Sequence, residues 1–202
     1  MLKVGLTGSI AVGKSFVLSV FSELGCHVLD ADLTAREVVM PGTHGLDRIV
    51  REFGEGVLTA EGTLDRPKMA SIVFSDESKR LLLNSIVHPL VFEAQDKWLR
   101  DREAEDPDGI AIVDAALLIE SGGYRRFEKL IVVWCEPEIQ FERLIQRDRM
   151  SEAEARRRIA SQMPQEEKKK YADLLIDTSG GFEATRERCR QVHSELLQLV
   201  SY

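Results

Sequence analysis

The sequence of 202 residues has few cysteines, no long apolar run and no excess of basic side chains. Cys26, Cys135 and Cys189 lie far apart and form no zinc or CxxC pattern, which favours free thiols in a reducing cytoplasm. The best apolar run, Leu130–Cys135, is far shorter than the ~18–20 residues of a membrane-spanning helix. The N-terminal MLKVGLTGS also lacks the pattern of a signal peptide.

Charge excludes a further class of function. The chain carries 27 Lys+Arg against 34 Asp+Glu, a formal net charge of −7. An acidic protein is a poor coat for nucleic acid, so we expect neither nucleic acid nor membrane among its partners. Apolar residues make up 44% and charged residues 30%, as in soluble globular domains.

Short apolar runs alternate with helical patterns along most of the chain. Strands are expected at Leu2–Leu6, His27–Leu29, Ile110–Val113, Leu130–Trp134 and Leu174–Ile176. Helices are expected at Lys14–Leu24, Pro137–Arg147, Ser151–Gln162 and Glu183–Val200. This alternation predicts an α/β fold, with a five-stranded parallel sheet flanked by helices.

One interval interrupts the alternation. Helices are expected there at Ala35–Val39, Leu46–Phe53, Arg66–Phe74, Asp76–Val87 and Pro89–Arg102, with a turn or small hairpin at 54–62. We therefore predict a core of residues 1–32, 109–147 and 171–202. A helical insertion that binds the acceptor would occupy 33–108, and a small lid 148–170.

The most specific motif runs from Gly8 to Ser15 and fits G-x-x-x-x-G-K-[ST] between a predicted strand and a predicted helix. Such a loop wraps backbone N–H groups around phosphate at a helix N-terminus. Its lysine, Lys14, would reach the β- and γ-phosphates of a nucleotide, and the Ser15 hydroxyl would ligate Mg²⁺. The alternative is a glycine-rich turn without a ligand. The residues assigned to ATP are Gly8, Ser9, Ile10, Ala11, Val12, Gly13, Lys14, Ser15 and Phe16.

Two loop positions depart from the common pattern. Ser9 and Ala11 stand where many such loops have glycine. Either residue fits there only if its φ is negative, and a requirement for positive φ would weaken nucleotide binding.

The loop alone does not name a reaction. No N-K-x-D motif for guanine is present, which argues against a common GTPase switch, and no basic face suggests an ATPase acting on nucleic acid. Size and pattern favour a small-molecule kinase, with a different acceptor such as a nucleotide or sugar as the alternative.

Carboxylates follow two predicted strands at the edge where doubly wound sheets bind ligands. Asp32 is our candidate for the base that accepts a proton from an acceptor hydroxyl, against a capping or surface role. Asp30 would instead cap a helix starting near Leu33. Asp114 is a candidate for supporting Mg²⁺, with a structural hydrogen bond or an acceptor contact as alternatives.

An arginine-rich segment follows the fourth predicted strand. Residues 143–170 carry nine basic and five acidic side chains. Ser151 and Glu154 form a capping box, so one helix should end near Arg147 and another restart at Ser151. Arg147 is our candidate for neutralising the transferring phosphoryl group, against a solvated helical face. That face would hold pairs such as Glu152–Arg156 and Glu154–Arg158, and for Arg156 and Arg157 we prefer this surface role.

With these motifs placed, the chain resembles the dephospho-coenzyme A kinase family. The resemblance rests on the phosphate loop, on Asp30-Ala-Asp32 and on His88-Pro89. It also rests on VDAALLIE at 113–120, Gln146-Arg147-Asp148, Gln162 and Ala172-Asp173. It implies a P-loop kinase fold with a helical insertion and a lid, and ATP-dependent phosphorylation of the ribose 3′-hydroxyl of dephospho-coenzyme A, with Mg²⁺.

The resemblance also implies residue roles. Asp32 matches the family's base, Lys14 its loop lysine and Arg147 its lid arginine, while His88 matches a residue facing the acceptor. From the sequence alone His88 reads as an ordinary histidine before Pro89. The departures are Ser9, Ala11, Ala116 and Thr178, where the family usually has Gly, Gly, Pro and Asn. We expect a cytoplasmic monomer, with a weak oligomer as the alternative.

Overall fold

The computed structural model describes residues 1–200, so the predicted core segment 171–202 ends in two residues outside the described part. The chain forms two compact units. The sheet unit comprises residues 1–30 and those from 101 onward, and the helical unit comprises Ala31–Arg100. No helix within residues 1–200 is both long and apolar enough to cross a membrane.

The sheet unit is built on a parallel sheet of the order β2-β3-β1-β4-β5. Its strands are β1 (Leu2–Thr7), β2 (His27–Asp30), β3 (Ile110–Asp114), β4 (Lys129–Trp134) and β5 (Leu174–Asp177). All five predicted strands are confirmed, and the apolar runs of β1, β3 and β4 are largely buried. In the central strand β1, Leu6 is in register with Asp114, one residue before the strand ends at Thr7.

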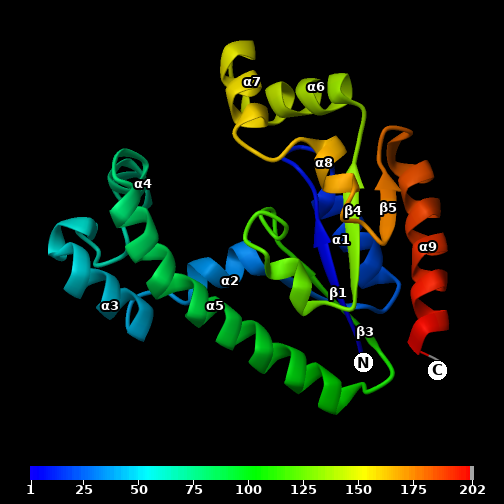
Figure 1. The fold of residues 1–202 in the computed structure, drawn as a ribbon, viewed down its shortest axis with the longest axis horizontal. Helices are drawn as coiled ribbons and strands as arrows, with labels where there is room; N and C mark the ends of the chain where they lie inside the picture. The colour runs from blue at the N-terminus through cyan, green and yellow to red at the C-terminus, as the bar shows by residue number, and fades with distance from the viewer. Residues whose placement is uncertain (201–202) are drawn as a thin grey trace. The chain divides into compact units, whose positions relative to one another are not determined.

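Helices cover the sheet and position its loops (Figure 1). They are α1 (Lys14–Glu23), α6 (Pro137–Asp148), α7 (Glu152–Ala160), α8 (Gln165–Lys169) and α9 (Gly181–Val200), with a 3₁₀ turn η2 at Gly123–Arg126. The apolar side chains of α1 and α9, among them Phe21 and Leu196, pack against alternate residues of β1 such as Val4. A smaller cluster around Leu118 and Val132 forms a second core within the unit.

The helical unit has a core of its own. It contains α2 (Ala31–Glu37), α3 (His44–Phe53), η1 (Glu55–Val57), α4 (Arg66–Ser75) and most of α5 (Glu77–Glu105). Its buried side chains are Val39, Ile49, Val57, Met69 and Ile86. The expected turn or hairpin at 54–62 is a 3₁₀ turn followed by a single bridge between Leu58 and Leu64.

Two helix predictions for this unit are corrected. The helix after β2 begins at Ala31, two residues before the predicted start near Leu33, and Asp30 ends β2. The predicted helices Asp76–Val87 and Pro89–Arg102 are one helix, α5, with Pro89 inside it. Pro89 leaves the Ser85 carbonyl without its helical donor, but both residues are exposed, so water can replace that donor.

Candidate active site

The phosphate loop has the context that the sequence predicted. It leaves β1 after Thr7 and opens α1 at Lys14, with Gly13 as the residue before the helix. Gly8 lies against β4, because a Cβ there would be 2.4 Å from the Val133 carbonyl oxygen. Gly13 has a φ of 90°, which glycine adopts at no steric cost. Both motif glycines are thus required by the backbone.

Ala11 contradicts the expectation of a negative φ. Its φ is +62°, and among the described non-glycine residues only Arg149 shares a positive value. Ser9 therefore meets the expectation and Ala11 does not. For a residue with a Cβ the left-handed region costs on the order of 1–2 kcal/mol, so surrounding contacts must hold Ala11 there.

Side chains from outside the loop hold its backbone on both sides of Ala11. The Ile10 N–H donates to Gln162 Oε1 at 2.8 Å, and the Ile10 carbonyl accepts from Gln140 Nε2 at 2.7 Å. The Val12 carbonyl accepts from Thr178 Oγ1 at 2.8 Å. The loop is therefore anchored to α6, to the α7–α8 connection and to the end of β5.

Lys14 contacts one of the predicted carboxylates. Its Nζ lies 3.2 Å from Oδ1 of Asp114, and both side chains are largely buried. Asp114 ends β3 beside β1, the position from which the topology brings it to the loop. Ser15 follows in the first turn of α1, and Lys14 and Ser15 both line a pocket beside the loop that is described below.

The oxygen-bearing side chains near Lys14 are suited to bind Mg²⁺. Ser15 and Asp114 offer a hydroxyl and a carboxylate, the oxygen ligands that Mg²⁺ takes alongside substrate phosphates. Within residues 1–200, no group of three or more His, Cys, Asp or Glu side chains could hold a metal by protein ligands alone. The residues therefore fit an ion shared with a nucleotide.

Arg147 lies in the last turn of α6 and lines the pocket. The helix ends at Asp148, Arg149 takes a left-handed conformation, and Ser151 starts α7 with a complete capping box, as predicted. The Arg147 guanidinium donates twice to Asp148, at 2.7 and 3.0 Å. These bonds lower the pKa of Asp148 and raise that of Arg147, so both groups stay charged.

The expected surface pairs are partly corrected. Arg156 pairs with Glu152 at 3.9 Å, as predicted. Arg158 pairs with Asp148 at 3.3 Å instead of Glu154, because Glu154 closes the capping box with Ser151. Asp148 thus holds two arginines from two helices.

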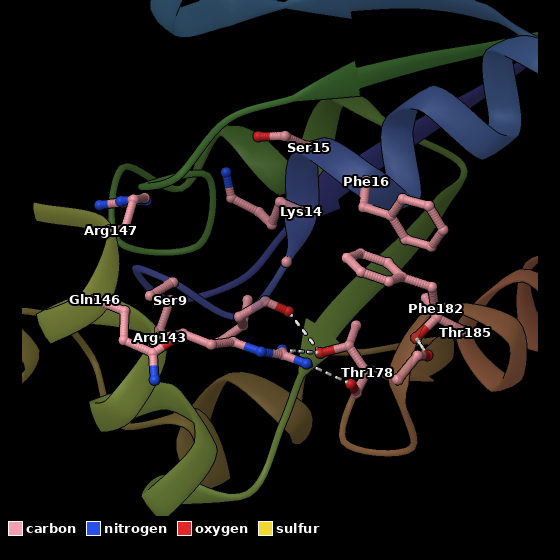
Figure 2. Close-up of a pocket in the computed structure, with 14 residues that line it drawn as sticks. Ser9, Lys14, Ser15, Phe16, Arg143, Gln146, Arg147, Thr178, Phe182 and Thr185 are labelled. Carbon is pink, nitrogen blue, oxygen red and sulfur yellow. Dashed lines mark hydrogen bonds between the residues drawn. The ribbon is translucent and has the colours of Figure 1, made fainter.

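A pocket of about 560 Å³ opens beside the loop (Figure 2). The sequence analysis gave no site role to six of its lining residues: Arg143, Gln146, Thr178, Gly181, Phe182 and Thr185. Arg143 donates to the hydroxyl and the carbonyl of Thr178, both at 2.8 Å. The rings of Phe16 and Phe182 meet edge to face, with centroids 4.7 Å apart. Phe16, which directly follows the phosphate loop in the sequence, was the available signal for an aromatic contact in this pocket.

The loop after β3 is anchored by a buried lysine. Lys168 is fully buried, and its Nζ lies 2.9 Å from both Glu120 Oε1 and the Ala116 carbonyl oxygen. Thr7 Oγ1 donates to the same carbonyl at 3.3 Å. Ala116, a departure from the family pattern, therefore has its backbone fixed by two donors.

Two predicted site residues belong to the helical unit. Asp32 is exposed in the first turn of α2. His88 is exposed near the middle of α5, with its ring centroid 6.2 Å from that of Phe92. The structure brings together Lys14, Ser15 and Arg147 at one pocket of the sheet unit, while the roles of Asp32 and His88 stay predictions.

Comparisons with known proteins agree with this geometry. A sequence model described as dephospho-CoA kinase matches residues 2–184. A dephospho-CoA kinase of Aquifex aeolicus is 42% identical over 97% of this chain and 98% of its own. A dephospho-CoA kinase of Mycolicibacterium paratuberculosis is 40% identical over 96% of this chain, which spans 47% of that longer protein. The solved dephospho-CoA kinase of Campylobacter jejuni superposes with a TM-score of 0.73 at 28% identity, covering 97% of both chains. The chain belongs to the dephospho-CoA kinase family.

Proposed function

We propose that the protein transfers the γ-phosphoryl group of ATP to the 3′-hydroxyl of the ribose of dephospho-coenzyme A, giving coenzyme A and ADP. The observation that carries this proposal is the joint position of the phosphate loop, Lys14 and Arg147 around one pocket, in a chain of this family. The last step of coenzyme A biosynthesis would follow from this activity.

The residues of the loop would bind the nucleotide. Backbone N–H groups between Gly8 and Ser15 would surround its phosphates at the N-terminus of α1, where the helix dipole favours negative charge. Lys14 would exchange its contact with Asp114 for the β- and γ-phosphates. Phe16 and Phe182 would offer apolar surface to the adenine.

Three side chains would serve the transfer itself. Asp32 would orient the acceptor hydroxyl and accept its proton, and His88 would contact the acceptor. Arg147 would neutralise charge on the transferring phosphoryl group. Mg²⁺, supported by Ser15 and Asp114, would neutralise the β- and γ-phosphate oxygens.

The setting of the enzyme is part of the proposal. Residues 148–170 would act as the lid over the phosphates and 33–108 as the acceptor-binding insertion. We place the enzyme in the cytoplasm, since all three cysteines are free and buried, as suits a reducing compartment, and we propose that it acts as a monomer.

The experiment offers the purified chain ATP, Mg²⁺ and dephospho-coenzyme A, and identifies the products by mass spectrometry. Lys14→Met is the control that removes the loop lysine. Coenzyme A and ADP in equal amounts support the proposal. Parallel reactions with nucleoside monophosphates and with sugars test the alternative, a small P-loop kinase that acts on a nucleotide or sugar. Phosphorylation of one of these without coenzyme A formation would overturn the proposal.

A further inference from the structure

The phosphate loop holds two residues in the left-handed region, and only one of them is suited to it. Gly13 has a φ of 90° and Ala11 a φ of 62°. Glycine populates this region freely, whereas the Cβ of alanine crowds the following carbonyl oxygen. An isolated Ala11 would therefore favour negative φ, which would turn the neighbouring peptide groups away from their observed directions.

The φ of a residue is set by the orientation of the peptide unit in front of it. For Ala11 this is the unit that carries the Ile10 carbonyl, and for Gly13 it is the unit that carries the Val12 carbonyl. Both carbonyls accept a hydrogen bond from a side chain outside the loop: Ile10 from Gln140 at 2.7 Å and Val12 from Thr178 at 2.8 Å. Each left-handed residue of the loop is thus preceded by a carbonyl that is held from outside.

Gln140 is itself fixed in the orientation that this bond needs. Its side chain is buried, and its Oε1 accepts from Gln165 Nε2 at 2.9 Å. The Oε1 of Gln165 accepts in turn from the Cys135 N–H at 3.1 Å. With its oxygen engaged by a donor, the Gln140 amide must direct its NH₂ group at Ile10.

We propose that Gln140 is a positioning residue whose hydrogen bond to the Ile10 carbonyl keeps Ala11 at positive φ, and so keeps the phosphate loop in its binding conformation. The proposal rests on the proposed function only in requiring that this loop binds ATP. Gln140 faces the loop backbone and acts through it.

Gln162 provides the matched control, because it also forms a hydrogen bond with the backbone of Ile10. It accepts from the Ile10 N–H at 2.8 Å, which belongs to the peptide unit before Ile10 and does not set the φ of Ala11. Loss of either glutamine removes one hydrogen bond to Ile10. Only the loss of Gln140 releases the peptide unit that defines the strained angle.

The test combines Gln140→Met and Gln162→Met with Ala11→Gly. Affinity for the Mg²⁺ complex of AMP-PNP is measured by calorimetry, which does not depend on the acceptor. We expect Gln140→Met to raise the Kd about threefold to tenfold in the Ala11 protein, the usual effect of one lost hydrogen bond. In the Ala11→Gly background, where positive φ carries no steric cost, the same change should raise it less than about twofold.

The control and the kinetics sharpen the result. Gln162→Met should change the Kd by the same factor in both backgrounds. If the wild-type protein forms coenzyme A, steady-state kinetics give a second measurement. Gln140→Met should then raise the KM for ATP more than it lowers kcat, and adding Ala11→Gly should bring the KM back. Because Ala11→Gly also relieves strain in the folded loop, thermal unfolding of each variant is measured beside the KM, and a KM of Gln162→Met that Ala11→Gly does not restore separates positioning from a general loss of stability.

Equal effects of Gln140→Met in the two backgrounds would overturn the proposal, as would an unchanged Kd in the Ala11 protein. If Gln140→Met does not fold, as judged by thermal unfolding, Gln165→Met replaces it, because it removes the donor that orients the Gln140 amide and leaves Gln140 itself in place; it also removes the acceptor of the Cys135 N–H. Its effect must then be suppressed by Ala11→Gly for the proposal to stand. A wild-type protein that binds AMP-PNP but forms no coenzyme A would refute the proposed function and leave this comparison intact.

Discussion

The ammonium group of Lys14 lies 3.2 Å from Oδ1 of Asp114, so the loop lysine already has a carboxylate partner at the end of β3. Besides the acceptor contact that the sequence left open, Asp114 can support Mg²⁺ or serve only as a countercharge for Lys14. These two roles predict different behaviour when the carboxylate becomes an amide.

Asp114→Asn should lower the rate and raise the Mg²⁺ concentration needed for half-maximal rate, about 10- to 100-fold, if the carboxylate supports the ion. The measurement is coenzyme A formation across a Mg²⁺ titration at saturating ATP. A Mg²⁺ dependence equal to that of the wild type would assign Asp114 to the structural contact with Lys14.

Asp32→Asn should abolish most turnover while leaving ATP affinity unchanged, because the amide cannot accept the hydroxyl proton. Steady-state rates and calorimetry with AMP-PNP measure the two quantities. Glu37→Gln is the matched control, since Glu37 is an exposed carboxylate at the other end of α2. A near-normal rate in Asp32→Asn would remove Asp32 from the role of base.

Arg147→Ala should reduce kcat about 10³-fold if the guanidinium stabilises the transferring phosphoryl group. Arg156→Ala is the control, because Arg156 is exposed and pairs with Glu152 on the surface of α7. It should leave kcat unchanged. A loss of less than tenfold in Arg147→Ala would mean that Arg147 only holds Asp148.

Lys168→Met should lower the free energy of unfolding by about 2–4 kcal/mol, because it leaves the Glu120 carboxylate without its buried partner. The double variant Lys168→Met/Glu120→Gln should lose less, since it removes both charges. Urea unfolding measures the free energy of unfolding of the wild type, the single variant and the double variant. Lys170→Met is the control, because its pair with Glu167 is exposed and should contribute at most about 1 kcal/mol. Equal losses for Lys168→Met and Lys170→Met would contradict the prediction.

The cysteines predict a loss of stability at alkaline pH. Burial raises the pKa of Cys26 to about 12 and that of Cys189 to about 11, from an ordinary 9.0, and also raises the pKa of Cys135. A raised thiol pKa contributes stability below the unfolded value that is lost as pH rises through the folded one. The free energy of unfolding should therefore fall between pH 9 and 12.

Urea unfolding at pH 7.5, 9 and 10.5 measures this fall, and Cys26→Ala should reduce it. A second measurement uses a thiol reagent at pH 8. The thiols should be nearly unreactive in the native protein and should all react in urea, because the thiolate is the nucleophile. Rapid labelling of the native protein would contradict the prediction.

The sequence predicted the sheet well because its strands read as short apolar runs, most clearly the fully buried β3. It failed at Pro89, where a residue that usually ends helices lies on an exposed side of a long one. Ile86 and Val91, on either side of it in α5, are both buried, and this burial stabilises a continuous helix. Local pattern cannot weigh that packing against the cost of proline.

The sequence predicted the parts of the site that are formed by residues close together in the chain, and it missed the contacts between residues that are far apart in the chain. Lys14, Ser15 and the capping box at Ser151 follow from spacing. The positive φ of Ala11 depends on neighbours distant in sequence, and so does the contact between Arg143 and Thr178. Gln140 lies 130 positions from Ile10 and Thr178 lies 35 positions from Arg143, and no spacing rule connects residues at such separations.

The strand order has a consequence for synthesis. Neither β1 nor β2 has the other as a neighbour, since β3 lies between them and emerges from the ribosome only after the helical unit Ala31–Arg100. At ~5–20 residues per second, the first two strands wait on the order of 4–16 s for their shared partner. The helical unit, with its own core, can collapse during that interval. The nascent chain must meanwhile keep the apolar edges of β1 from other chains, so slower translation between β2 and β3 should lower the yield of folded protein.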